Sequence, residues 1–194
     1  ENAVKNLVKL IEKSNYTVET GFHGTPYILF ALCDNGEKTT AFRLLTSERC
    51  PSWLYEVKAG ASTVWERWDG LDENGCCPIG DDGTAAVMIS YNHYASGAAC
   101  DFLYKRVLGI EPIEAGYKKF RIKPITGGGI TFAKGGVETP YGKAESEWKE
   151  ENGKFYLKVK IPFGTKCTVT LPSGKTEEKG SGEYTFEEDV SELK

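Results

Sequence analysis

The sequence predicts an α+β chain in which a helical first half is followed by an antiparallel β-sandwich. Apolar residues recur at helical spacing through much of the first hundred residues, but after Gly109 they alternate with polar residues at a period of two. Short turn sequences separate the alternating runs, as in sheets that have one face in water. We therefore place one domain at residues 1–110 and a second domain at residues 111–194.

Two helices are expected near the N-terminus. In residues 1–14, Val4, Leu7 and Ile11 recur at helical spacing, with charged residues on the other side. A second helix is expected to start at Thr25-Pro26, because threonine is a good N-cap and proline suits the first turn. It should end at residues 34–36, Asp-Asn-Gly, where a left-handed residue can close it.

A third and a fourth helix complete the predicted helical half. The third covers residues 38–47, and the fourth runs from Ser90 or Asn92 to a point before Gly109. Small residues in the fourth helix allow close packing against a neighbour. The residues between these two helices are expected to be an irregular segment that carries function on a helical scaffold.

Alternating runs predict the strands of the second half. Phe120 and Ile122 alternate with charged residues, and so do the apolar residues of 154–161, which follow the hairpin turn Asn152-Gly153. Residues 167–171 alternate in the same way before a turn at residues 172–174. Trp148 also follows the alternation expected of a core residue. Strands of this kind indicate an antiparallel sandwich.

Composition excludes several classes of partner. The net charge of −4 and the lack of a basic cluster argue against nucleic acid. No apolar run approaches the roughly 20 residues of a membrane span. Residues 1–14 are amphipathic and do not resemble a signal peptide. We expect neither nucleic acid nor a membrane as a partner.

The six cysteines predict neither a metal site nor a disulfide framework. They form no C-x-x-C pair, and only two histidines accompany them. Neighbours such as Cys76-Cys77 and Asp81-Asp82 cannot easily bind one ion together, so no metal or other cofactor is expected. Cys33 and Cys100 fall in apolar helical patterns and are predicted to be buried free thiols. Free thiols favour a reducing, cytoplasmic compartment, although secretion stays open because the true N-terminus is expected further upstream.

Two short blocks predict a carbohydrate site. In Trp65-Glu66-Arg67-Trp68-Asp69 one carboxylate lies between two indoles, and Trp53 precedes the block. About two dozen residues later, Asn92-His93-Tyr94 places an imidazole between an amide and a phenol. Indoles and phenols offer flat apolar faces to sugar rings, while carboxylate, imidazole and amide bind hydroxyls directionally. A carboxylate in such a cleft can be the general base of glycoside hydrolysis.

Each of these residues also has a structural interpretation. Glu66 is either the general base or a structural carboxylate paired with a cation such as Arg67. His93 either donates to a sugar hydroxyl or to Glu66, or it is a satisfied residue at a helix start. The indoles form either an apolar wall of the site or part of the core; they are Trp53, Trp65 and Trp68. Arg67, Asp69 and Asn92 are expected to support the site without binding substrate.

These motifs, with others in the same order along the chain, resemble those of the bacterial α-L-rhamnosidases of glycoside hydrolase family 78. The matching segments are residues 20–27, 51–55, 60–69, 92–95 and 116–120. The resemblance implies the end of a catalytic (α/α)6 barrel followed by a C-terminal β-sandwich. It assigns the general base to Glu66 and a sugar contact to His93. Residues 71–87, rich in glycine and aspartate, are longer than the family usually shows there, which leaves substrate preference open.

The resemblance also implies an activity: inverting hydrolysis that removes terminal α-L-rhamnose from glycosides. Such hydrolysis needs a second carboxyl group to protonate the leaving oxygen. The family carries this acid upstream, and a complete barrel needs more helices than the four expected here. We therefore expect a C-terminal portion that is inactive alone. A non-catalytic carbohydrate-binding or structural β-sandwich module and another (α/α)6 glycosidase or lyase are the alternatives.

Helices taken from a barrel should keep apolar faces that packed against neighbours. We expect these faces to drive a homodimer through the helical half, since exposed apolar side chains favour association. The residues expected on these faces are Leu7, Val8, Ile11, Tyr27, Phe30 and Phe42.

Overall fold

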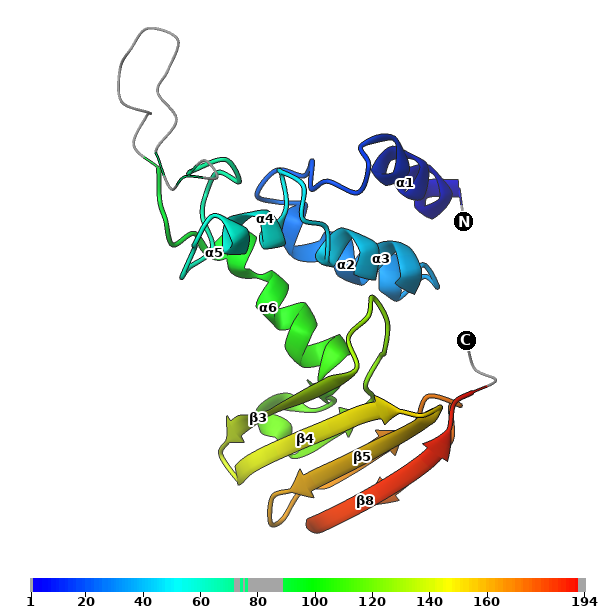
Figure 1. The fold of residues 1–194 in the computed structure, drawn as a ribbon. Coiled ribbons are helices and arrows are strands. Elements are labelled where there is room, and N and C mark those ends of the chain that lie inside the picture. The colour runs from blue at the N-terminus through cyan, green and yellow to red at the C-terminus, as the bar shows by residue number, and fades with distance from the viewer. Residues whose placement is uncertain (1, 72–73, 75, 77–88, 192–194) are drawn as a thin grey trace, which may run out of the picture. The chain divides into compact units, whose positions relative to one another are not determined.

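The structure, a computed structural model, describes residues 2–71, 74, 76 and 89–191. The chain divides into two compact units, residues 1–100 and residues 101–194 (Figure 1). The first unit is helical and the second is built from two sheets. The expected fold class is thus confirmed.

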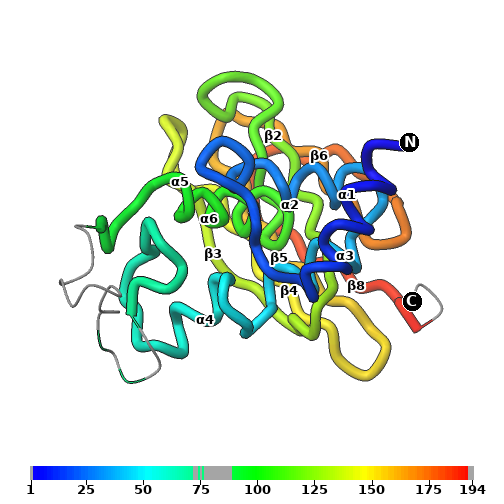
Figure 2. Tube along the Cα trace, turned by 90° about the horizontal axis from the view of Figure 1, so that it is seen from above, coloured from blue at the N-terminus to red at the C-terminus, as the bar shows by residue number. Residues whose placement is uncertain are grey.

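Five short helices lie in the described residues of the first unit. They are α1 (Asn2–Lys13), α2 (Thr25–Cys33), α3 (Lys38–Leu45), α4 (Trp53–Lys58) and α5 (Tyr94–Gly97). Helices α2 and α3 pack against each other and against α1, an arrangement that Figure 2 shows from above. Their shared core holds fully buried side chains such as Leu29, Leu32 and Phe42.

Helix α2 begins and ends close to the predicted residues, but its N-cap is one residue earlier than expected. Proline lies in the first turn, where its missing N–H costs no hydrogen bond. The N-cap is Gly24, not Thr25, because the Thr25 hydroxyl bonds back to Gly21 O at 3.0 Å from inside the helix. After the helix ends, Gly36 adopts a φ of 89°, in the left-handed region that glycine tolerates.

The segment between the third and fourth predicted helices contains α4, which was not expected. The Ser52 side chain accepts a hydrogen bond from the Tyr55 N–H at 3.1 Å and so caps this six-residue helix. The fourth predicted helix is divided. It consists of α5, α6 (Ala99–Phe102) and a π-helical turn, η1 (Leu103–Val107).

The second unit is a sandwich of two four-stranded sheets. One sheet has the order β1-β2-β6-β7 and the other β3-β4-β5-β8. The strands are β1 (Ile110–Pro112), β2 (Lys119–Ile122), β3 (Phe132–Thr139), β4 (Gly142–Glu151), β5 (Lys154–Ile161), β6 (Lys166–Thr170), β7 (Thr176–Lys179) and β8 (Gly182–Asp189), with a short 3₁₀ turn, η2 (Ala115–Tyr117), before β2.

One pairing departs from the antiparallel expectation. Strands β2 and β6 run parallel, with Phe120 opposite Cys167 and Ile122 opposite Val169. The chain leaves β2, builds β3, β4 and β5 in the other sheet, and returns to the first sheet in the direction of β2. All other strand pairs are antiparallel in the part of the chain that the structure describes.

The predicted alternation places the sandwich core correctly. Phe120, Leu157 and Val169 are fully buried, as their spacing predicts. Trp148 is only 1% exposed, and its Nε1–H donates to Val107 O at 2.8 Å. The indole therefore joins β4 to the segment that precedes the sandwich.

Three expectations about burial need correction. Cys33 is buried, but Cys100 is exposed because Ala99 and Phe102 are the buried residues of α6. Ile11 and Phe42, expected on a face left open for association, are buried because the first unit closes a core of its own around them. The described cysteines are free thiols: Cys33, Cys50, Cys76, Cys100 and Cys167.

Candidate functional site

Two backbone segments of the first unit lie side by side and bring the two predicted blocks together. The Glu66 N–H donates to Ser90 O at 2.8 Å, and the His93 N–H donates to Val64 O at 2.8 Å. The Thr63 hydroxyl also bonds to the carbonyl of Tyr91. These bonds align residues 63–66 with residues 90–93, so the predicted base and the predicted histidine come from paired segments.

The Glu66 carboxylate is part of this pairing. Its Oε2 accepts the Ser90 N–H at 2.8 Å, while its own N–H bonds to the Ser90 carbonyl. The side chain is half-buried. A carboxylate that accepts one N–H still has lone pairs for a water or a sugar hydroxyl, as a general base requires.

The two charged residues that follow Glu66 pair with each other. Arg67 forms a two-point ion pair with Asp69, from Nε to Oδ1 at 3.1 Å and from Nη2 to Oδ2 at 2.8 Å. This hydrogen bonding holds the pKa of Asp69 below its ordinary value, since the Arg67 guanidinium stabilises the carboxylate. That they orient Glu66 stays a prediction.

His93 is held between aromatic rings at the N-terminus of α5. Its ring stacks on Phe22, with centroids 4.6 Å apart, and on Tyr94, with centroids 5.4 Å apart. Its Nδ1 is buried and has no hydrogen-bond partner among the described residues. Because both stacking contacts use the ring faces, a polar ligand would have to meet the imidazole at its edge. Phe22 was not predicted as part of the site.

The three tryptophans of this region divide into two buried residues and one half-buried residue. Trp53 and Trp65 are buried, and the Trp53 Nε1–H donates to Ser96 O at 2.9 Å. Trp65 meets Tyr91 edge to face, with centroids 5.7 Å apart. Trp68 is half-buried against the edge of Trp53. Trp68 is therefore the indole with surface left for a ligand.

Asn92 is exposed, and its described contact is through the backbone. Its N–H donates to Ser90 Oγ at 3.2 Å, which supports the turn before His93. The turn thus sets the direction in which the chain enters α5.

Sequence reasoning missed a buried carboxyl group beside this site. Glu56 of α4 is 2% exposed, and its Oε2 accepts the Trp65 N–H at 3.1 Å. Burial raises the pKa of Glu56 to about 7, although the Trp65 hydrogen bond opposes the rise. A signal was present in the sequence: Glu56 follows Trp53 by three residues, which puts both on one face of a helix.

The sequence predicts no metal site at Cys76-Cys77 and Asp81-Asp82. Of these residues, Cys77, Asp81 and Asp82 lie outside the described residues, as do most of residues 71–87. Among the residues that are described, no three His, Cys, Asp or Glu side chains come together as a metal site would require. A helix of the length and apolarity of a membrane span is likewise not found in the described ranges.

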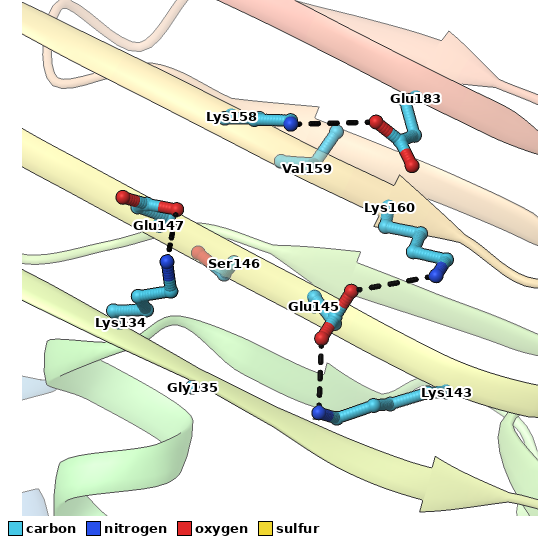
Figure 3. Close-up of a pocket in the computed structure, with 10 residues that line it drawn as sticks. All are labelled: Lys134, Gly135, Lys143, Glu145, Ser146, Glu147, Lys158, Val159, Lys160 and Glu183. Atoms are coloured by element: carbon cyan, nitrogen blue, oxygen red, sulfur yellow. Dashed lines mark ion pairs between the residues drawn. The ribbon is translucent and has the colours of Figure 1, made fainter.

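The outer face of the second sheet carries a hollow of about 230 Å³ lined by charged residues (Figure 3). Lysine and glutamate side chains pair there. Three pairs join neighbouring strands, Lys134 with Glu147 at 3.0 Å, Lys160 with Glu145 at 3.6 Å and Lys158 with Glu183 at 3.4 Å, and one lies within β4, Lys143 with Glu145 at 2.9 Å. Exposed pairs of this kind are screened by solvent and contribute little net stability. Trp148 is buried, so its indole offers no platform for a sugar on this face.

Comparison with protein families gives two adjacent matches. Residues 1–107 match the bacterial alpha-L-rhamnosidase 6 hairpin glycosidase domain, and residues 109–186 match the bacterial alpha-L-rhamnosidase C-terminal domain. An alpha-L-rhamnosidase of Formosa agariphila is 36% identical over 178 residues, which are 91% of this chain and 18% of that protein.

Solved structures give the same result. The native α-L-rhamnosidase of Aspergillus terreus has a TM-score of 0.88 and 35% identity, over 96% of this chain and 21% of that one. The Streptomyces avermitilis alpha-L-rhamnosidase, solved in complex with L-rhamnose, has a TM-score of 0.85 and 33% identity, over 96% of this chain and 19% of that one. The chain thus spans about a fifth of the length of the relatives that it matches.

Proposed function

The chain belongs to the bacterial α-L-rhamnosidase family, and we propose that it forms the C-terminal portion of an inverting glycoside hydrolase that removes terminal α-L-rhamnose from glycosides. The pairing of residues 63–66 with residues 90–93 carries this proposal, because it brings the segments of Glu66 and His93 together. The substrate would be a rhamnose-containing glycoside, as the L-rhamnose complex of the Streptomyces relative suggests.

In this proposal Glu66 is the general base. A water molecule attacks the anomeric carbon on the face opposite the leaving group, and its proton passes to the Glu66 carboxylate. The bond from the anomeric carbon to the leaving oxygen breaks, and a separate acid protonates that oxygen. The Ser90 N–H, 2.8 Å from Oε2, keeps the carboxylate directed while the other oxygen accepts the proton.

His93 and Trp68 would bind the sugar. The stacked imidazole offers its edge to a ring hydroxyl, and the half-buried indole offers an apolar surface to the methyl group of a 6-deoxy sugar. Trp53 and Trp65 would support them from the core. Arg67 and Asp69 would hold the chain beyond Glu66 through their ion pair.

The general acid is expected to come from outside these 194 residues. Proton transfer to the leaving group contributes roughly 10²–10⁴-fold to such reactions. We therefore expect little or no hydrolysis of an aryl α-L-rhamnoside by this chain alone. Robust turnover that disappears in Glu66→Gln would show that a second acid is present here and would contradict this part of the proposal.

The base is tested in a fusion that joins this chain to the upstream part of the Streptomyces relative. Glu66→Gln should lower kcat by roughly 10²-fold or more, because the amide cannot accept a proton from water. Glu48→Gln is the matched control, since Glu48 is an exposed carboxylate of the same unit paired with Lys58. An active fusion in which both variants keep the parent kcat would refute the role of Glu66.

A further inference from the structure

Glu56 is the one carboxyl group among the buried residues that the structure describes. Its Oε2 accepts the Trp65 N–H, and its Oε1 has no hydrogen-bond partner in the described part of the chain. A buried carboxyl group without full hydrogen bonding costs stability. Neither the general base nor the sugar contacts proposed above use it.

Helix α4, which carries Glu56, is bonded to one of the paired segments and to helix α5, which follows the other. Glu56 holds the Trp65 N–H at 3.1 Å, one residue before the candidate base. Trp53, one turn earlier on the helix, donates to Ser96 O at 2.9 Å, three residues after His93. Glu66 is then bonded to Ser90 through both its N–H and its Oε2. The helix and the paired segments thus form one hydrogen-bonded frame.

We propose that Glu56 is a positioning residue: its buried carboxyl group holds the Trp65 backbone and thereby fixes the place from which the Glu66 side chain extends. This inference rests on the proposed role of Glu66 as the base. Glu56 itself touches no reacting atom, because both of its oxygens are buried and one of them is bonded to the Trp65 backbone.

The protonation state of Glu56 should affect this hold. Burial raises the pKa of Glu56 to about 7, so the carboxyl group is neutral below that pH and charged above it. The charged form is the stronger acceptor for the Trp65 N–H, but it leaves a buried charge on Oε1. Cys50 lies close enough to Glu56 for the charge to affect the pKa of its thiol. The pKa of its thiol is raised by burial and further by the charges of Asp69 and Glu56.

Two variants separate the positioning role from a general packing role. Glu56→Gln keeps an oxygen acceptor for Trp65 and resembles the neutral acid, but it cannot titrate. Glu56→Leu fills a similar volume and removes the acceptor. Glu48→Gln, at an exposed carboxylate of the same unit, controls for loss of charge alone.

The readout is amide NMR of the 194-residue chain across pH 5–9, which needs no catalysis. The amides of Trp65 and Glu66 should titrate together with a midpoint near 7 in the parent chain. They should not titrate in Glu56→Gln, and they should keep the parent midpoint in Glu48→Gln. In Glu56→Leu the Trp65 amide proton should exchange at least about tenfold faster. If Glu56→Leu does not fold, the Glu56→Gln titration alone decides.

The proposal is overturned if the Trp65 and Glu66 amides titrate in Glu56→Gln as in the parent chain, or if they show no midpoint near 7 in the parent. It is also overturned if folded Glu56→Leu keeps the parent exchange rate at Trp65. In the active fusion, Glu56→Gln should keep kcat within a few-fold, whereas Glu56→Leu should lower kcat with little change in KM. If the NMR results are as expected but Glu66→Gln leaves kcat unchanged, the role of Glu66 as general base is refuted. The positioning of the Trp65 backbone by Glu56 would still stand.

Discussion

At the scale of single residues, Glu56 makes the stability of the helical unit depend on pH. Its pKa rises from the ordinary 4.5 to about 7 on folding, so between these values the folded state binds more protons than the unfolded state. The free energy of unfolding should therefore fall as pH rises through this window. One pKa unit corresponds to about 1.4 kcal/mol, so the loss is on the order of 3 kcal/mol.

Glu56→Gln removes this loss, because an amide does not ionise. Denaturant unfolding at pH 4 should give nearly equal stability for the parent chain and the variant. At pH 8 the variant should be more stable by up to about 3 kcal/mol. If the variant and the parent chain differ in free energy of unfolding by the same amount at both pH values, the buried carboxyl group does not titrate as described. The control variant Glu48→Gln should follow the parent curve.

The residue chemistry of the site was only partly predictable from the sequence. The order Trp65-Glu66 and the Asn92-His93 pair marked two segments that the structure brings side by side, because hydrogen-bonding and aromatic residues are concentrated there. The burial of Glu56 and the stacking of Phe22 on His93 depend on contacts between distant segments. The spacing of Trp53 and Glu56 hinted at a shared helix face, but it could not show which distant residues that face meets.

At the scale of elements, periodicity predicted the long segments and missed the short or charged ones. Helix α4 has six residues, too few to show a helical period, although Ser52 marked its start. The buried residues of strand β4 are Ala144, Ser146 and Trp148. Only Trp148 is large and apolar, so one residue is too little to predict the whole strand from the sequence. The direction of β6 beside β2 was also not predictable, because alternation is the same in parallel and antiparallel strands.

The junction between η1 and β1 depends on Gly109. This residue has a φ of 86°, and a Cβ placed there would lie 2.4 Å from Pro124 N and 2.5 Å from Lys123 C. Its carbonyl also accepts the Lys123 N–H at 3.0 Å, which holds the backbones together. Gly109→Ala should therefore destabilise the sandwich by roughly 2–5 kcal/mol in thermal or denaturant unfolding.

Gly180→Ala provides the control for this substitution. Nothing lies within 4 Å of a Cβ at Gly180, so the change should have little effect. Equal stability of the two alanine variants would mean that the β1 junction can shift to accept a side chain.

At the scale of the whole molecule, the expected homodimer stays a prediction with a changed set of residues. Ile11 and Phe42 are buried, but Leu10 is 63% exposed and Tyr27 is 69% exposed. Leu7, Val8 and Phe30 of the expected set are half-buried. Burying a large apolar side chain contributes about 1.5–3 kcal/mol, so several together can hold two chains.

Light scattering over a dilution series should show a dimer that dissociates as the concentration falls. Leu10→Glu should move the midpoint to higher concentration by roughly tenfold or more, since it removes apolar area and adds like charges across a two-fold axis. Phe163→Glu is the control, because this 88% exposed residue belongs to the second unit. A monomer at every concentration would contradict the dimer.

The parallel pairing of β2 with β6 also bears on the order in which the second unit folds. Strands β3, β4 and β5 are joined by short turns, whereas Lys119 must find Lys166 after that whole antiparallel set has been synthesised. Closing a longer loop costs more entropy before its contacts form, which delays non-local pairs. In pulse-labelled refolding, we expect the amides shared by β4 and β5 to gain protection first. Protection at β2 and β6 should come last. The sheet that contains β2 and β6 would then form after the sheet that contains β4 and β5.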